Sequence, residues 1–133
     1  MTFPFLLLWS EWAIFALRVF VGALFLAHGL PKLKNLKGTG EWFQSVGFKP
    51  RFFWGTVAAL AEFFGGMALI LGFFTQVAAA ILALQFLVIL AWRLKRRDSF
   101  VGGWELDLVV LGALFALLTL GGGAYALDYW LRF

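Results

Sequence analysis

The feature that most constrains this chain is a set of four apolar runs, each about as long as a bilayer is thick. They cover residues 12–30, 52–74, 75–92 and 104–121. A helix needs about 20 such residues to cross a hydrocarbon core of about 30 Å. Backbone groups in lipid must find partners within their own segment, and none of the runs alternates as a membrane strand would. The sequence therefore predicts an all-α membrane protein, a bundle of four transmembrane helices.

The composition supports this fold class. Hydrophobic residues make up 63% of the chain and charged residues only 14%, whereas a soluble domain is about half apolar and about a quarter charged. A core this small cannot hide the surplus, which must face lipid. No linker interrupts the sequence, so we expect one domain over residues 1–133. A cleavable signal peptide is not expected, because the N-terminus lacks a basic start and carries Pro4.

The basic residues predict the orientation of the bundle. Of eleven Lys and Arg, five lie in residues 31–51 and four in 93–97, and none lies between the second and third runs. Cytoplasmic loops concentrate positive charge, so loops one and three should be cytoplasmic and both termini outside. This is the pattern of a multi-pass protein of the cell membrane. Nucleic-acid binding is excluded as an explanation of the charge, because no soluble surface carries it.

Local signals set the expected ends of the helices. Pro31 should close the first run, Gly72 should allow a tight reversal before the third, and Gly121–Gly123 should end the fourth. Within loop one, residues 39–44 are compatible with a short interfacial helix capped by Thr39. A mobile loop anchored by its aromatic residues explains the same stretch equally well.

The residue inventory limits the chemistry. Cysteine is absent, which excludes disulfides, thiol relays and thiolate metal sites. One histidine and two methionines argue against a protein-ligated haem, and no metal-ligand spacing is present. We therefore expect no metal and no covalently bound cofactor. A redox role would require a bound organic cofactor or a partner protein.

Polar residues inside the runs are the candidate functional residues, because each charge in a bilayer costs about 2.5–3.5 kcal/mol on insertion scales. Arg18 and Glu62 should lie about 6 Å apart in depth, within reach of a guanidinium stem. We expect them to form an ion pair in the bundle interior, with Gln85 at the same level. A purely structural latch is an equally good explanation of this pair.

A second polar layer is expected at the cytoplasmic end. His28 and Lys32 lie near the end of the first run, and Glu105 and Asp107 open the fourth. A histidine facing an acid would titrate near physiological pH. We predict that His28, Glu62 and Glu105 line one cavity open to the cytoplasmic leaflet. The two acids of the fourth run could instead be ordinary cap residues at a helix N-terminus.

Short motifs along the chain resemble those of the DoxX family of small four-helix membrane proteins. The resemblance covers essentially the whole length and rests on Leu17-Arg18 with Gly22, His28-Gly29-x-x-Lys32-Leu33, Ala61-Glu62-x-x-Gly65-Gly66, Leu71-Gly72-x-x-Thr75, Glu105, and Gly122-Gly123-x-Tyr125-x-Leu127-Asp128. Some DoxX-like proteins are associated with quinone-linked oxidation of sulfur compounds or thiols, as membrane subunits beside other redox proteins. The resemblance therefore implies a subunit of a redox system.

Three functions stay open at this stage. The first is a quinone-interacting subunit of a membrane oxidoreductase, with aromatic residues such as Phe25 and Phe63 around the ring. Its polar contacts would come from Arg18, His28, Glu62 and Glu105, supported by Lys32, Gln85 and Asp107. The second is a non-catalytic assembly or scaffold subunit. The third is a transporter of protons or a small solute. A redox partner and a homo-oligomer are compatible with each.

Overall fold

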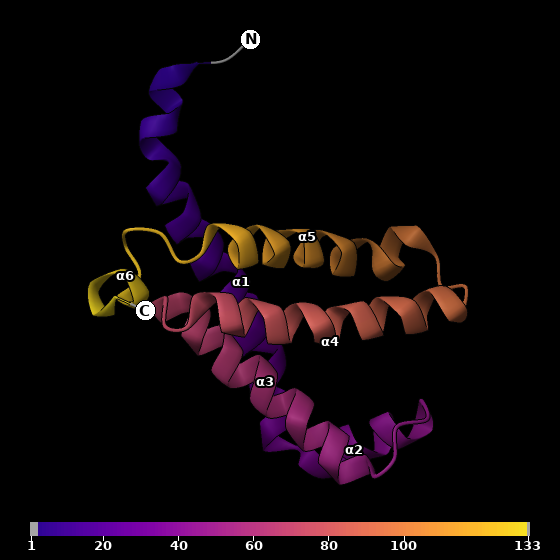
Figure 1. Cartoon of the computed structure of the whole chain (residues 1–133). Coiled ribbons are helices and arrows are strands. Elements are labelled where there is room, and N and C mark those ends of the chain that lie inside the picture. Colours follow the sequence, from indigo (N-terminus) through magenta and orange to yellow (C-terminus); the bar gives the residue numbers. More distant parts are fainter. Residues whose placement is uncertain (1–2, 133) are drawn as a thin grey trace.

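The computed structural model describes residues 3–132 and is helical nearly throughout this range, without a strand. Its helices are α1 (Ser10–Lys34), α2 (Leu36–Ser45), α3 (Arg51–Leu71), α4 (Thr75–Lys95), α5 (Glu105–Leu120) and α6 (Leu127–Leu131). A 3₁₀ turn, η1 (Pro4–Trp9), precedes α1, and a kinked turn, η2 (Phe100–Trp104), precedes α5. Successive long helices run in opposite directions, so α2 marks one end of the bundle and α6 the other (Figure 1).

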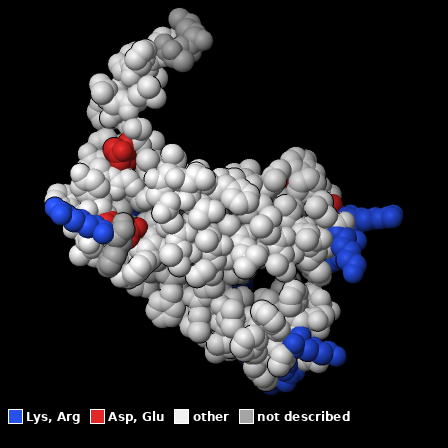
Figure 2. Space-filling view, viewed as in Figure 1, with Lys and Arg blue, Asp and Glu red and all other residues white. Residues whose placement is uncertain are grey.

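Four helical segments are long and apolar enough to cross a membrane, which confirms the predicted fold class. They are Pro4–Lys34, Arg51–Leu71, Thr75–Lys95 and Phe100–Leu120. Many large apolar side chains on them face outward, where lipid would cover them. Figure 2 shows a largely uncharged middle, in white, with charged side chains gathered near the two ends of the molecule.

Two expected helix boundaries in the first half are wrong. Pro31 lies inside α1, which continues to Lys34. A proline this close to the end removes one hydrogen bond, while its own carbonyl still accepts from the amide of Asn35. Thr39 does not cap α2 but lies within it. The cap is Asn35, whose side chain accepts from the amide of Gly38.

The predicted turns at glycine are confirmed. Gly72 ends α3 in the left-handed conformation, with φ +68°, and α4 begins three residues later. Gly121, with φ +75°, ends α5. Only glycine adopts such dihedrals without strain, so these residues set the lengths of α3 and α5.

The bundle consists of two helix pairs, α1 with α3 and α4 with α5, joined mainly through α3 and α4. In Figure 1 α4 and α5 lie side by side, while α3 crosses them obliquely. Glycines bring α1 and α3 into backbone contact. A Cβ at Gly22 would lie 2.6 Å from the carbonyl oxygen of Gly66, and one at Gly29 would lie 2.6 Å from the amide nitrogen of Phe63. This close approach positions polar side chains of α1 against α3.

Candidate functional site

A buried carboxylate stands at the centre of the polar interior. Glu62 of α3 is only 2% exposed. The ammonium nitrogen of Lys32 lies 2.6 and 2.7 Å from its two oxygens. The side-chain amide of Gln85 on α4 donates to the same carboxylate. Three helices thus hold one acid through an ion pair and a charge-assisted hydrogen bond, and the predicted participation of Gln85 is confirmed.

The expected ion pair between Arg18 and Glu62 is wrong. The guanidinium of Arg18 is fully buried and donates to three backbone carbonyls, at 3.0 Å to Leu69, 3.1 Å to Ile70 and 2.8 Å to Tyr125. Leu69 lies seven residues beyond Glu62 on α3, about 10 Å further along the axis. The last carbonyls of a helix carry partial negative charge and lack partners within the helix. The carbonyls of Leu69 and Ile70 therefore bind Arg18 at the α6 end of the bundle. Glu62 is bound instead by Lys32, which approaches it from the α2 end.

Arg18 of α1 binds the segment after α5 through the carbonyl of Tyr125, and we call this segment the C-terminal clamp (residues 121–131). The two carboxylate oxygens of Asp128 accept from the amides of Phe74 and Thr75, at 2.6 and 2.7 Å. The amide of Asp128 in turn donates to the carbonyl of Gly72 at 2.8 Å. The clamp therefore caps the start of α4 and closes the α6 end of the bundle.

The clamp also contacts the beginning of α1. The amide of Ala124 donates to Glu11 at 2.6 Å, and the rings of Trp12 and Tyr125 lie 4.5 Å apart. Sequence reasoning missed this arrangement. Its only signal in the sequence was the motif Gly122-Gly123-x-Tyr125-x-Leu127-Asp128, which follows directly after the last span.

A second ionic contact joins α4 to α5 near the α2 end. The guanidinium nitrogen Nε of Arg93 lies 2.9 Å from Asp107, and Nη1 donates to the carbonyl of Gly103 at 3.1 Å. Asp107 is buried, and it lies near enough to His28 of α1 for the two side chains to interact electrostatically. Asp107, predicted only as a supporting residue, is thus the inward-facing acid of α5.

Glu105 has a local role in the structure. Its carboxylate accepts from the amide of Gly102 at 2.8 Å, within the turn that precedes α5. This bond does not cap α5, because Gly102 precedes the helix and the N-cap residue Trp104 makes no side-chain cap bond. The shared cavity of His28, Glu62 and Glu105 stays a prediction, because neither of the two cavities described next is lined by any of them.

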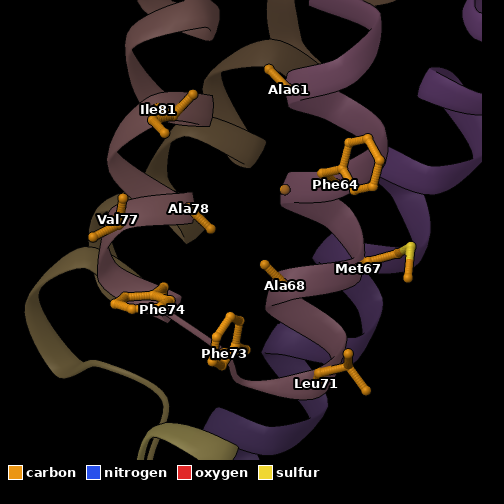
Figure 3. Close-up of a pocket in the computed structure, with 11 residues that line it drawn as sticks. Ala61, Phe64, Met67, Ala68, Leu71, Phe73, Phe74, Val77, Ala78 and Ile81 are labelled. Carbon is orange, nitrogen blue, oxygen red and sulfur yellow. The ribbon is translucent and has the colours of Figure 1, made fainter. Parts of the chain in front are cut away.

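The larger cavity is an apolar cleft of about 450 Å³ between α3 and α4 (Figure 3). Its lining is aliphatic and aromatic: Ala61, Phe64, Gly65, Met67, Ala68, Leu71, Phe73, Phe74, Val77, Ala78 and Ile81. The cleft extends from the turn between the two helices to Ala61 and Ile81. Ala61 precedes Glu62, and Ile81 lies one turn before Gln85, so the cleft ends beside the polar cluster.

The smaller cavity is a groove of about 300 Å³ between the end of α1 and α2. It is lined by Pro31, Lys32, Asn35, Gly38, Thr39, Trp42 and Phe43. The aromatic residues expected around a ring lie elsewhere: Phe25 is buried against Phe86 at 5.2 Å, and Phe63 packs on Phe64. Within residues 3–132 no group of three or more His, Cys, Asp or Glu could hold a metal ion.

Comparison with known proteins gives consistent matches. The model of the DoxX family matches residues 13–93. A Bacillus subtilis (strain 168) protein named "Putative oxidoreductase CatD" is 34% identical over 112 residues, covering 84% of this chain and 81% of that protein. "Inner membrane protein YqjF" of Escherichia coli (strain K12) is 29% identical over 116 residues, covering 84% and 85%. No solved structure matches.

Proposed function

This chain belongs to the DoxX family of multi-pass cell-membrane proteins, and we propose that it is a quinone-interacting membrane subunit of an oxidoreductase system. The name of the Bacillus subtilis relative supports the oxidoreductase part of this proposal. The observation that carries the quinone part is the position of Glu62. It is a buried acid held by a lysine and an amide, beside the end of an apolar cleft that faces the lipid.

The cleft and the polar cluster fit the two halves of an isoprenoid quinone. The cleft is open and lined by small and aromatic side chains, which suit an apolar ring and chain taken from the bilayer. Gln85 and Lys32 carry hydrogen-bond donors for quinone oxygens. A carboxylate lies beside each end of the cleft, but Asp128 accepts only from backbone amides, whereas Glu62 stands next to the side-chain donors Lys32 and Gln85. We therefore place the head group at the Glu62 end.

Each residue of the cluster then has a distinct role. A bound quinone would supply two-electron, two-proton redox chemistry and exchange its electrons with a redox partner. Glu62 holds or accepts a proton at its carboxylate. Lys32, with its ammonium nitrogen 2.6 and 2.7 Å from the two carboxylate oxygens, holds this buried acid in an ion pair. Gln85 fixes the orientation of the carboxylate and presents its amide toward α3.

The test is the quinone content of the protein purified in mild detergent, measured by organic extraction and chromatography. We expect stoichiometric quinone in the native chain and a loss of it in Glu62→Gln, which removes the proton-accepting group but keeps the shape. Glu41→Gln, an exposed carboxylate on α2, is the matched control. Absence of quinone from the native protein, or equal content in both variants, would refute the proposal.

A scaffold function has its own supporting observation, because the contacts of Arg18 and of the C-terminal clamp all hold helices of this chain together. This function predicts an empty extract and a stable co-purifying partner. A proton-transporting function would be supported by proton flux in liposomes that Glu62→Gln abolishes. Each of these results differs from the stoichiometric quinone expected here.

A further inference from the structure

The groove between α1 and α2 is amphipathic and lies at the α2 end of the bundle, which carries most of the basic residues. Its polar lining comes from Lys32, Asn35 and Thr39, and its aromatic wall from Trp42 and Phe43. With about 300 Å³ it holds a compact head group rather than a large cofactor. The groove does not overlap the apolar cleft, so it can bind a ligand of its own.

Two hydrogen-bond donors are available at this groove. The ammonium group of Lys32 has three hydrogens, and its contacts to the two oxygens of Glu62 use two of them. About a third of the Lys32 side chain stays exposed. Asn35 uses its side-chain oxygen to accept from Gly38, and its amide nitrogen has no hydrogen-bond partner among residues 3–132. Both groups can therefore donate to an anion.

The surrounding charge is positive. Lys34, directly before the groove-lining Asn35, and Lys37, two residues after it, are both exposed. Glu41 is the only acid in Leu36–Ser45, and Glu62 is buried beneath Lys32. Basic pockets at the cytoplasmic ends of transmembrane helices attract anionic lipid head groups. The predicted orientation places this groove on that side of the membrane.

The position of α2 supports a lipid as the source of the anion. Gly40 and Gly55 hold α2 against α3, since a Cβ at Gly55 would lie 3.1 Å from the α-carbon of Gly40. Trp42 is half exposed and packs edge to face against Trp92 of α4, with ring centroids 5.7 Å apart. Aromatic residues of this kind lie at the level of lipid head groups. The groove is thus a fixed feature at the depth where lipid phosphates lie.

We propose that this groove binds the phosphate group of an anionic phospholipid, with Lys32 and Asn35 as donors and Trp42 and Phe43 packed against the glycerol backbone. Lys32 is shared with the buried Glu62, so the two anions compete for one ammonium group. Loss of the charge on Glu62 frees Lys32 for the lipid. The proposal therefore predicts that removal of the Glu62 carboxylate by substitution raises lipid affinity, which a merely basic surface would not produce.

The experiment is native mass spectrometry of the full chain with phosphatidylglycerol or zwitterionic phosphatidylcholine added in detergent. Gly38→Ala is the main variant, because its Cβ would lie 2.5 Å from the amide nitrogen of Asn35 and displace a flexible side chain only. Lys32→Met with Glu62→Gln removes the shared ammonium and its partner together. Glu62→Gln alone tests the competition. Lys95→Met, an exposed lysine of α4 at the same end, is the matched control.

We expect phosphatidylglycerol affinity to fall roughly tenfold in Gly38→Ala and in the double variant, as loss of one charge-assisted bond predicts. It should rise in Glu62→Gln and stay unchanged in Lys95→Met. Native affinity in Gly38→Ala and the double variant, equal retention of phosphatidylcholine, or an equal loss in Lys95→Met would overturn the proposal. So would a fall in Glu62→Gln.

A separate arm distinguishes the source of the phosphate. Millimolar inorganic phosphate should not displace the lipid, because it lacks the glycerol and acyl contacts with the aromatic wall. If it displaces phosphatidylglycerol and binds alone, the groove is a site for soluble phosphate and the lipid proposal is wrong. Quinone content should be native in Gly38→Ala, so failure here is distinguishable from failure of the quinone proposal.

Discussion

Replacement of Arg18 by methionine tests whether a buried charge stabilises this membrane protein through backbone carbonyls alone. Methionine is an unbranched, uncharged side chain, so it removes the guanidinium donor from the carbonyls of Leu69, Ile70 and Tyr125, of which Leu69 keeps the amide of Gly72 as a donor. The guanidinium also lies 5.5 Å from the ring centre of Phe15, a contact that methionine largely retains through its sulfur. The substitution therefore removes the three hydrogen bonds together with the electrostatic interaction between the guanidinium and Asp128.

Two opposing terms set the magnitude. Hydrogen bonds from a charged donor contribute about 1.5–3 kcal/mol each, so the three bonds of Arg18 contribute roughly 4.5–9 kcal/mol. Burial of an arginine costs about 2.5–3.5 kcal/mol on insertion scales, and methionine avoids this cost. The hydrogen-bond contribution is larger than the cost of burial, so we expect Arg18→Met to lower the free energy of unfolding by about 3 kcal/mol.

The assay is reversible unfolding in mixed micelles with increasing SDS, followed by helix content. Arg18→Lys should also be destabilising, because one ammonium cannot reach three carbonyls as a planar guanidinium does. Arg132→Met, an exposed arginine at the same end of the bundle, is the control and should unfold like the native chain. If Arg18→Met is as stable as the native chain or more stable, the argument is refuted, because desolvation then outweighs the three bonds.

Asp128→Ala removes the cap at the start of α4 and should cost about 1–2 kcal/mol in the same assay; an unchanged midpoint would mean that water replaces the cap. Gly22→Leu places side-chain atoms where the α3 backbone now lies, and we expect a loss of about 1–3 kcal/mol together with lower quinone content. Single cysteines at Thr39 and Thr119 test the orientation. An impermeant thiol reagent should label the first only from the cytoplasmic side and the second only from outside, and the reverse result would invert the predicted topology.

Hydropathy and glycine positions predicted the fold well because both act locally. Length and apolarity alone identify a span, and a left-handed residue such as Gly72 ends a helix wherever it occurs. The depth argument also placed Gln85 correctly beside Glu62. It failed for Arg18 because it considered only side chains as partners. Backbone carbonyls at a helix end are strong acceptors, and a residue pattern gives no sign of which of them an arginine will reach.

The preference for Glu105 over Asp107 had a different cause. On α5 the buried positions Asp107, Val110, Leu111, Leu114 and Leu117 follow one helical stripe. Asp107 therefore shares the phase of the core residues, whereas Glu105 does not. The sequence carries this pattern, but reading it requires knowing at which residue α5 begins. The kinked turn η2 before the helix obscures that position. The pairing with Arg93 depends on the α4–α5 contact and could not be predicted from either helix alone.

The C-terminal clamp has a consequence for how the protein is made. Arg18 enters the bilayer with the first span, but its acceptor on Tyr125 is 107 residues further along the chain. During synthesis the ribosome therefore delivers a membrane-embedded cation well before its final partner exists. Insertion of four complete spans cannot finish assembly, because the clamp must afterwards fold back over the ends of α1 and α3. A segment synthesised after all four spans thus supplies a hydrogen-bond acceptor for the buried arginine of the first span.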